Sequence, residues 1–393
     1  MPQASLLQSS NSGGLPQLRG ETTDLLTTSV PASPPKTSPP LPSKPRRHRG
    51  VATLADVARE AGVSVMAASV VLNGAKSATR TSAETRARVV AAAERLHYRA
   101  NATARALANG RANAIGIVAS HWKEDANLYF MEILGGIIES ATPSRQTVSV
   151  FMLQGWEEAQ QRIPEICDGR VDGLILVAPR LGIDVSGWMP RQVPVTSLHS
   201  ENAIDGVVNL EPDEEAGSFE AVSQMLAIGH RRILHIGGPA GLLGAQRRLA
   251  GYRRAHEAAR LQPPDDHVVH SSLNADGGRE AVLDWLQRHH GEKIPEAVFC
   301  ANDAIALGCI QALAMKGLRV PEDVSVVGFD DIWFARASSL ATVRQPLHAM
   351  GRRATEVLME QIQARREGGQ WQGPANIILP TEFVHRATLK SPR

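Results

Sequence analysis

The stretch that decides the fold of the N-terminal region is TLADVAREAGVSVMAASVVLNG, residues 53–74. Starting from Leu54, apolar side chains recur at the i, i+3, i+4, i+7 spacing of one helical face. Thr53 is a good N-cap, and Gly62 can take the left-handed conformation that ends a helix. Ser64 can cap a second short helix, from Val65 to about Leu72. Two helices joined by so short a turn predict a helix-turn-helix, whose second helix fits the major groove.

The segments on either side of this motif define an N-terminal domain. A third helix is expected after Ser82, running to about Leu96, with an apolar stripe that closes a three-helix core. We therefore expect a DNA-binding headpiece over residues 51–98. Residues 1–50 are rich in Ser, Pro, Thr and Gly, which predicts a disordered arm.

After Arg111 the chain alternates short buried-type strands with amphipathic helical stretches. The expected strands are Ala114–Ser120, Gly173–Ala178, Val193–Leu198, Ile233–Gly237, Ala297–Ala301 and Val324–Phe329, and two of the clearest helices are Glu214–Ile228 and Asp303–Lys316. This alternation predicts parallel sheets with helices on both faces. Residues 112–393 suit two lobes, the first from about 112–211 and 345–375 and the second from about 212–344 and 376–393. A ligand cleft is expected at the carboxyl ends of the strands.

The charge distribution points to a polyanionic partner. Residues 44–50 carry four basic residues and no acidic one, and residues 51–111 carry nine Arg and Lys against four Asp and Glu. The formal net charge of the whole chain is only +2, so the remainder is acidic. A basic head on an acidic body is typical of a protein that touches nucleic acid with one end.

Other features argue against several classes of protein. The three cysteines (Cys167, Cys300 and Cys309) lie in apolar surroundings without metal-ligand spacing, which favours reduced core thiols in a cytoplasmic protein. We find no apolar run long enough to span a membrane and no secretory signal. No catalytic motif, cofactor site or metal site is expected, so the protein is not expected to be an enzyme.

Several further motifs occur in a fixed order along the chain. They are LHY (96–98), NATARAL (101–107), VDGLI (171–175), AND (301–303) and GLRVPEDVSVVGFDD (317–331). Together with the headpiece, they make residues 51–388 resemble the lactose-repressor (LacI/GalR) family of bacterial transcription regulators. The resemblance implies a headpiece followed by a hinge helix or linker over residues 99–111, joined to a two-lobed α/β domain like that of periplasmic sugar-binding proteins.

The resemblance also implies function and partners. It implies a repressor that binds double-stranded operator DNA as a homodimer and responds to a small-molecule effector, a sugar or related metabolite. Such a protein is expected in the cytoplasm, associated with the nucleoid, with no membrane partner. A strand-like C-terminal segment without leucine heptads favours a dimer over a tethered tetramer. The main rival is a sugar-binding receptor, which the headpiece and the missing signal peptide disfavour.

Residue by residue, the resemblance assigns DNA contacts in the headpiece and hinge. Phosphate-positioning roles fall on Thr53, Ser64, Ser69 and Asn73, although capping and turn stabilisation explain Ser64 and Asn73 equally well. The base-facing set is Val65, Met66 and Val70, with Val70 standing where the family commonly has an arginine. Lys76 and Arg80, in a loop longer than usual, are candidates for replacement phosphate contacts. In the hinge the assigned residues are Asn101, Ala104 and Leu107, the last as a wedge between base steps.

Six residues are candidates for the effector site. Arg248 matches a ligand-binding arginine, and Asn302 and Asp330 match positions that hydrogen-bond ligand hydroxyls. Asn302 and Asp330 could instead only cap strand-to-helix turns. Tyr129, Phe130 and Trp333 could stack on a sugar face or belong to the core.

Overall fold

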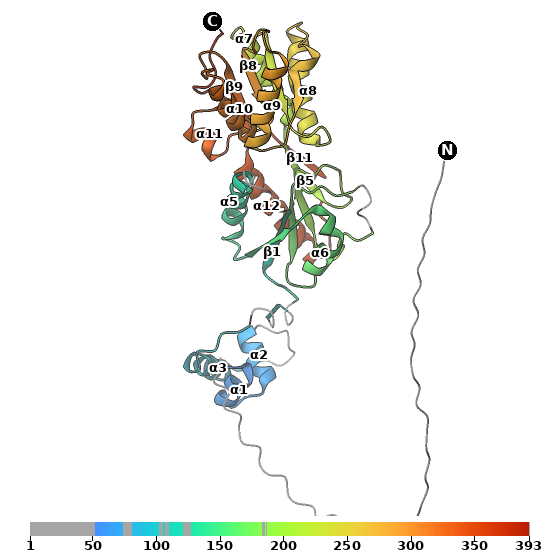
Figure 1. The fold of residues 1–393 in the computed structure, drawn as a ribbon. Helices are drawn as coiled ribbons and strands as arrows, with labels where there is room; N and C mark the ends of the chain where they lie inside the picture. The colour runs from blue at the N-terminus through green and yellow to red at the C-terminus, as the bar shows by residue number, and fades with distance from the viewer. Residues whose placement is uncertain are drawn as a thin grey trace, which may run out of the picture. The chain divides into compact units, whose positions relative to one another are not determined.

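The structure is a computed structural model that describes residues 52–73, 81–101, 105–106, 110–120, 127–182, 185 and 187–392 (Figure 1). The expected N-terminal arm and most of the expected hinge helix lie outside these residues.

The headpiece is a three-helix unit formed by α1 (Leu54–Ala61), α2 (Val65–Asn73) and α3 (Ala83–Arg95). The three predicted helices are therefore confirmed, with ends that differ by at most one residue. Thr53 caps α1 in a capping box with Asp56, and Gly62 ends it at φ +65°. The core lies between the helices and consists of small and β-branched residues: Val57, Ala58, Ala61, Ala68, Val89, Ala92 and Ala93.

The first lobe is built on a six-stranded sheet in the order β11-β5-β4-β3-β1-β2, in which every pairing is parallel. Its strands are β1 (Ala114–Ser120), β2 (Thr147–Leu153), β3 (Gly173–Val177), β4 (Val195–Leu198), β5 (Val208–Pro212) and β11 (Asn376–Leu379). Helices α5 (Asn127–Ala141) and α12 (Leu347–Arg366) pack on one face, and α6 (Ala159–Ile166), preceded by the 3₁₀ turn Trp156–Glu158, packs on the other. The continuous apolar strands expected for a doubly covered sheet are therefore present.

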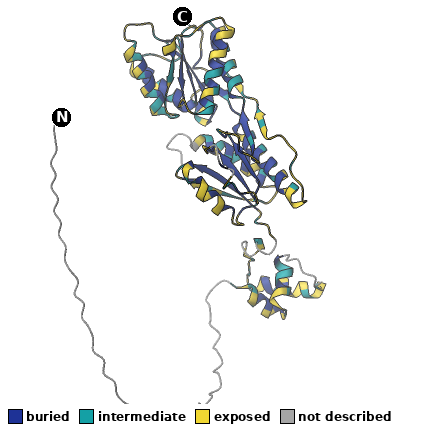
Figure 2. Cartoon of the chain, turned by 90° about the vertical axis from the view of Figure 1, so that its right-hand side faces the viewer, coloured by how far each residue is buried: buried dark blue, intermediate teal, exposed yellow. Residues whose placement is uncertain are grey.

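The second lobe repeats this plan with the order β12-β10-β9-β8-β6-β7. Its strands are β6 (Ile233–Gly237), β7 (Val268–His270), β8 (Ala297–Cys300), β9 (Ser325–Asp330), β10 (Ala341–Arg344) and β12 (Glu382–Val384), the last antiparallel to β10. Helices α7 (Glu214–Ala227) and α8 (Leu243–Ala258) cover one face, and α9 (Ala275–Arg288) and α10 (Asp303–Met315) cover the other. The short elements Asp265–His267 and α11 (Trp333–Ala337) complete the lobe. Figure 2 shows both sheets buried beneath helices whose outer faces are exposed.

The chain passes between the lobes three times: from β5 to α7, from β10 to α12, and from β11 to β12. The prediction that the second lobe takes up residues 376–393 is wrong in one respect. β11 pairs with β5 in the first sheet, so Asn376–Leu379 belongs to the first lobe. The strand-like C-terminal segment is in fact two short strands in different sheets, separated by residues 380 and 381. No helix among the described residues is long and apolar enough to cross a membrane.

Candidate DNA-binding and effector sites

Helix α2 offers an apolar surface for DNA. Val65 and Met66 at its start are 49% and 66% exposed, whereas Val70 is half-buried. The helix carries neither a basic nor an acidic side chain. Base reading by this helix stays a prediction, and it would rest on methyl and thioether groups rather than on the charged forks that commonly read guanine.

The expected phosphate-contacting side chains also have local partners. Ser64 Oγ accepts from the backbone N–H of Ala67 at 3.1 Å, which caps α2. Thr53 donates its hydroxyl to Asp56 at 2.7 Å, and Asn73 Nδ2 donates to Ser69 Oγ at 3.1 Å. Asn73 is buried, so its first role is to hold the end of α2. Phosphate contacts by these residues stay predictions.

The remaining DNA-binding assignments fall in the loop between α2 and α3 and in the hinge. Asn101 is exposed, and its carbonyl accepts from the backbone N–H of Arg105 at 3.0 Å. Lys76, Arg80, Ala104 and Leu107 lie outside the described residues. Their expected contacts with DNA likewise stay predictions.

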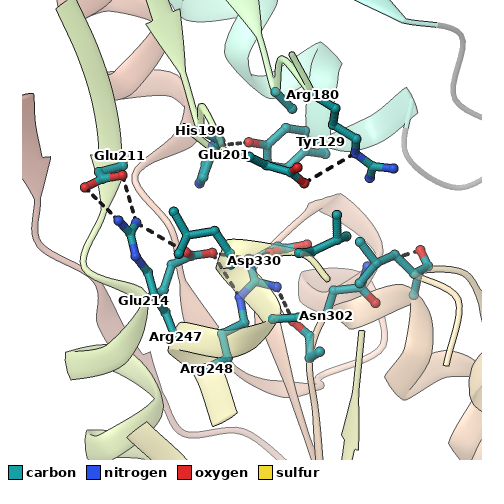
Figure 3. A pocket seen from close by; sticks show the side chains of 18 of the residues that line it. Tyr129, Arg180, His199, Glu201, Glu211, Glu214, Arg247, Arg248, Asn302 and Asp330 are labelled. Atoms are coloured by element: carbon teal, nitrogen blue, oxygen red, sulfur yellow. Dashed lines mark hydrogen bonds and ion pairs between the residues drawn. The ribbon is translucent and has the colours of Figure 1, made fainter. Parts of the chain in front are cut away.

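The body has a cavity of about 320 Å³ between its lobes, at the carboxyl ends of the strands (Figure 3). The predicted position of the ligand cleft agrees with this cavity. Of the six expected effector residues, Tyr129, Arg248, Asn302 and Asp330 line it. Phe130 is instead buried in the core of the first lobe, and Trp333 is 63% exposed on α11, outside the lining. The spacing of these two aromatic residues did not reveal which face of their helices meets the cavity.

Arg248 is the central cation of this site. Its Nε and Nη2 donate to the same oxygen of Glu214, at 3.2 and 2.8 Å, and its Nη1 donates to the carbonyl of Ala301. Nη2 also lies 3.8 Å from Asp330 Oδ1, and the guanidinium stacks 4.1 Å above the ring of Phe329. Burial disfavours the charge of Arg248, but the two carboxylates offset this and leave its pKa raised. The guanidinium is therefore permanently charged and held in one place.

A chain of hydrogen bonds joins the lobes at the far wall of the cavity. Gln345 donates its amide to Asp330 Oδ1, so its carbonyl oxygen is left to accept from His199 Nε2 at 3.0 Å. With that proton on Nε2, His199 Nδ1 accepts from the hydroxyl of Tyr129. Tyr129 and His199 belong to the first lobe, Asp330 to the second, and Gln345 to the connection between them. This hydrogen-bond network thus connects the cavity wall to the β10–α12 connection between the lobes.

Burial sets the protonation of this chain. It lowers the pKa of His199 to about 4, so the imidazole is neutral at pH 7. Burial also raises the pKa of the Asp330 carboxyl to about 6, with Arg248 opposing part of that rise. Burial acts in opposite senses on the pKa of an acid and of a base because it disfavours whichever form is charged, whereas the positive charge of Arg248 lowers the pKa of both groups.

Acid should therefore destabilise the body through His199. The imidazole has a pKa near 6.5 in the unfolded chain and about 4 in the folded protein, so between these values the unfolded chain binds a proton that the folded protein does not. The contribution of His199 to the free energy of unfolding is therefore complete above pH 6.5 and is lost as the pH falls toward 4. From pH 7 to 5.5 this single group should cost about 1 kcal/mol. His199→Gln should reduce the pH dependence of the unfolding free energy in urea by that amount. An unchanged slope in the variant would show that His199 titrates normally.

Asn302 has a structural as well as a lining role. Its Oδ1 accepts from the backbone N–H of Ile305 at 2.8 Å and caps α10, and its Nδ2 donates to the carbonyl of Leu273 at 3.2 Å. The alternative that it caps a strand-to-helix turn is therefore correct, and it lines the cavity at the same time.

The sequence did not single out several charged lining residues. Glu214 is 2% exposed and holds Arg248, while Arg247 forms a bidentate pair with Glu211 at 2.7 and 3.1 Å. Arg180 and Glu201 face each other at 3.7 Å on the first lobe. Most of these residues lie just after the carboxyl end of a parallel strand or beside an assigned residue. This position was the feature of the sequence from which they could have been identified as lining residues.

Comparison with known proteins agrees with both halves of the molecule. Residues 53–101 match the model of bacterial regulatory proteins of the lacI family, and residues 222–389 match that of the periplasmic binding protein-like domain. The transcriptional repressor PurR of Vibrio cholerae is 32% identical over 353 residues, which cover 86% of this chain and 98% of the relative. PurR of Haemophilus influenzae is 31% identical, over 87% and 99% of the two chains.

Solved structures give the same result. The lac repressor dimer bound to operator and the anti-inducer ONPF is 29% identical, with a TM-score of 0.73, and the alignment covers 86% of this chain and 99% of that one. The complex of the transcriptional regulator CelR with cellobiose is 27% identical, with a TM-score of 0.61 over 86% and 99% of the chains.

A helix-turn-helix headpiece on a two-lobed ligand-binding body defines a ligand-responsive transcription regulator. The chain belongs to the lacI family of bacterial regulatory proteins. It is a DNA-binding transcription repressor regulated by a small-molecule effector, and its relatives are repressors rather than enzymes. As a repressor acting on bacterial DNA, it works in the cytoplasm.

Proposed function

We propose that the effector is a neutral polyhydroxylated molecule, a sugar or close relative, bound in the cavity between the lobes. The observation that carries this proposal is the charge balance of the lining. Its described residues include three arginines and four carboxylates, and each arginine faces a carboxylate: Arg180 with Glu201, Arg247 with Glu211, and Arg248 with Glu214. An anionic ligand would find no spare cation and would add to a negative excess.

Hydroxyl groups suit this lining better than charges do. A hydroxyl both donates and accepts hydrogen bonds. One ligand hydroxyl can therefore donate a hydrogen bond to Asp330 while the next accepts one from Arg248, since Asp330 Oδ1 and Arg248 Nη2 lie 3.8 Å apart. Leucine and isoleucine side chains on the lining (Leu242, Leu243, Leu273 and Ile332) supply apolar surface for carbon–hydrogen faces. The cellobiose bound by the regulator CelR is an example of this chemistry in a similar protein.

A ligand panel tests the proposal on the full chain. Thermal shift and calorimetry should detect neutral sugars and polyols, and a binder should change the affinity for operator DNA. Sugar phosphates and dicarboxylates should bind at least tenfold more weakly than the matching neutral compounds. Tighter binding of an anionic compound would overturn the charge argument.

We propose that the repressor is a homodimer that uses the β2 edge of the first lobe. Strand β2 ends the sheet and exposes Val150 and Met152, and the neighbouring α5 exposes Met131 and Ile138. Adjacent exposed apolar residues on an open sheet edge favour association. The similar lac repressor was solved as a dimer on its operator.

The double variant Val150→Glu/Met152→Glu tests this surface. It should sediment as a monomer at concentrations where the parent is a dimer, and its operator affinity should fall because only one half-site is bound at a time. Ile378→Glu is the matched control, since Ile378 is an exposed apolar residue on β11 at the opposite edge of the same sheet. Dissociation by the control and not by the double variant would place the interface elsewhere.

We further propose that residues 51–98 and the hinge of residues 99–111 form the operator-binding region and keep the protein on the nucleoid. Their excess of basic side chains supports this role, because displaced counterions make binding to any DNA favourable and strongly salt-dependent.

A further inference from the structure

A second cavity, of about 870 Å³, opens beside the effector cavity. We call it the side groove. The two spaces are adjacent, because five residues line both: Ser200, Glu201, Glu211, Leu243 and Arg247. The side groove runs along the β5–β11 edge of the first lobe, between the loops around 189–207 and the C-terminal half of α12 with the segment that follows it.

A polar contact between the two lobes lies where the two spaces adjoin. Arg247 on α8 of the second lobe pairs bidentately with Glu211 on β5 of the first. Glu211 also accepts from Asn209 at 3.2 Å and from Asn376 at 2.8 Å, which fixes its carboxylate. The Arg247–Glu211 pair therefore stands between the two spaces, and a ligand that spans them must lie against this pair.

The wall of the side groove carries features that suit a second sugar ring. Trp371, half-buried, is the one tryptophan among the described residues lining either space, and its Nε1 donates to Glu360 at 2.9 Å. Gly373 lies against the indole so closely that a Cβ there would be 2.0 Å from Cζ2. The indole is thus held in place, and a rigid amphipathic ring can pack against an apolar sugar face.

An unsatisfied acceptor lies in the same wall. Gln361 is 7% exposed, and its Oε1 has no hydrogen-bond partner among the described residues. A buried acceptor without a donor is costly. Because this oxygen is itself enclosed, a ligand hydroxyl in the side groove could donate to it only after the Gln361 side chain turns.

We propose that the side groove binds the distal part of an extended effector, so that the ligand is an oligosaccharide of two or more rings rather than a single sugar. This inference rests on the proposed neutral-sugar function. The effector cavity alone, at about 320 Å³, lies at the small end of ligand sites. The groove also lies at the opposite edge of the sheet from β2, so the proposed dimer leaves it open.

Calorimetry on the full chain with sugars of increasing length tests the inference. The probes are glucose with cellobiose and cellotriose, glucose with maltose and maltotriose, and xylose with xylobiose and xylotriose. In the series that binds, affinity should rise at least tenfold from one ring to two. Ala203→Trp, which fills the groove from an exposed loop position, should remove this gain and leave binding of the single ring unchanged.

Two further variants separate the possible failures. Trp371→Ala should reduce only the two-ring affinity, and Trp371→Phe should restore part of it, which a general folding defect would not do. If one ring binds as tightly as two and Ala203→Trp has no effect, the groove inference is overturned while the neutral-sugar proposal stands. If no neutral sugar binds and an anionic compound does, the proposed function itself is overturned.

Discussion

Arg248→Ala is expected to abolish the effector response and to destabilise the body by about 3–5 kcal/mol, because it removes the hydrogen-bonded partner of a buried carboxylate and leaves it only the longer contact with Arg247, at 3.8 Å. Glu214 is almost fully buried, and its carboxylate faces the Arg248 guanidinium at 2.8 Å. Asp330 and the Ala301 carbonyl also lose the guanidinium. The variant should therefore unfold at lower urea concentration and fail to bind effector. The headpiece folds around its own core, so DNA binding should persist below the unfolding transition.

A second variant separates the two effects. The double variant Arg248→Ala/Glu214→Gln also removes the negative charge of Glu214. Most of the lost stability should therefore return, while effector binding stays absent. Calorimetry at a temperature where both variants are folded measures binding, and urea titration measures stability. Effector affinity equal to that of the parent in either variant would show that Arg248 only supports the fold.

The elements and the site differed in how far the sequence could predict them. The headpiece helices and Ala114–Ser120 were predictable because caps, glycine and periodicity act over a few neighbouring residues. The assignment of β11 was not, since a short strand joins whichever sheet edge lies beside it in space. Arg248 and Asp330 were found through the resemblance to the family, but Glu214 was not, although its burial is what makes Arg248 the centre of the site.

The geometry of the site also suggests how ligand binding reaches the rest of the molecule. The lobes are joined by ion pairs at both sides of the cleft, Arg247 with Glu211 and Arg336 with Glu132, each at 2.7 Å. Glu211 and Gln345 lie next to two of the three interlobe connections. Glu211 lines the cavity and Gln345 is bonded to Asp330 of the lining, so a ligand in the cavity acts beside both connections. Differential contact of this kind is what an allosteric ligand requires.

The recognition helix should read DNA in an unusual way for the family. Val65 and Met66 present exposed apolar surface, and Val70 stands where an arginine would read guanine O6 and N7. None of these side chains donates a hydrogen bond, but each can pack on the C5-methyl group of thymine. We expect half-sites richer in A·T than the family norm and a lower ratio of specific to non-specific affinity, with the remaining specificity taken from DNA shape.

Val70→Arg should convert one symmetric position of the operator to a preference for guanine, worth about 1–3 kcal/mol or roughly 5- to 150-fold in affinity. Selection from a random DNA library, run in parallel for the parent and the variant, measures this change. Met66→Ala is the matched control: it should weaken the thymine preference without creating one for guanine, because it removes methyl contacts and adds no donor. A strongly required guanine opposite Val70 in the parent would show that a different side chain reads that base pair.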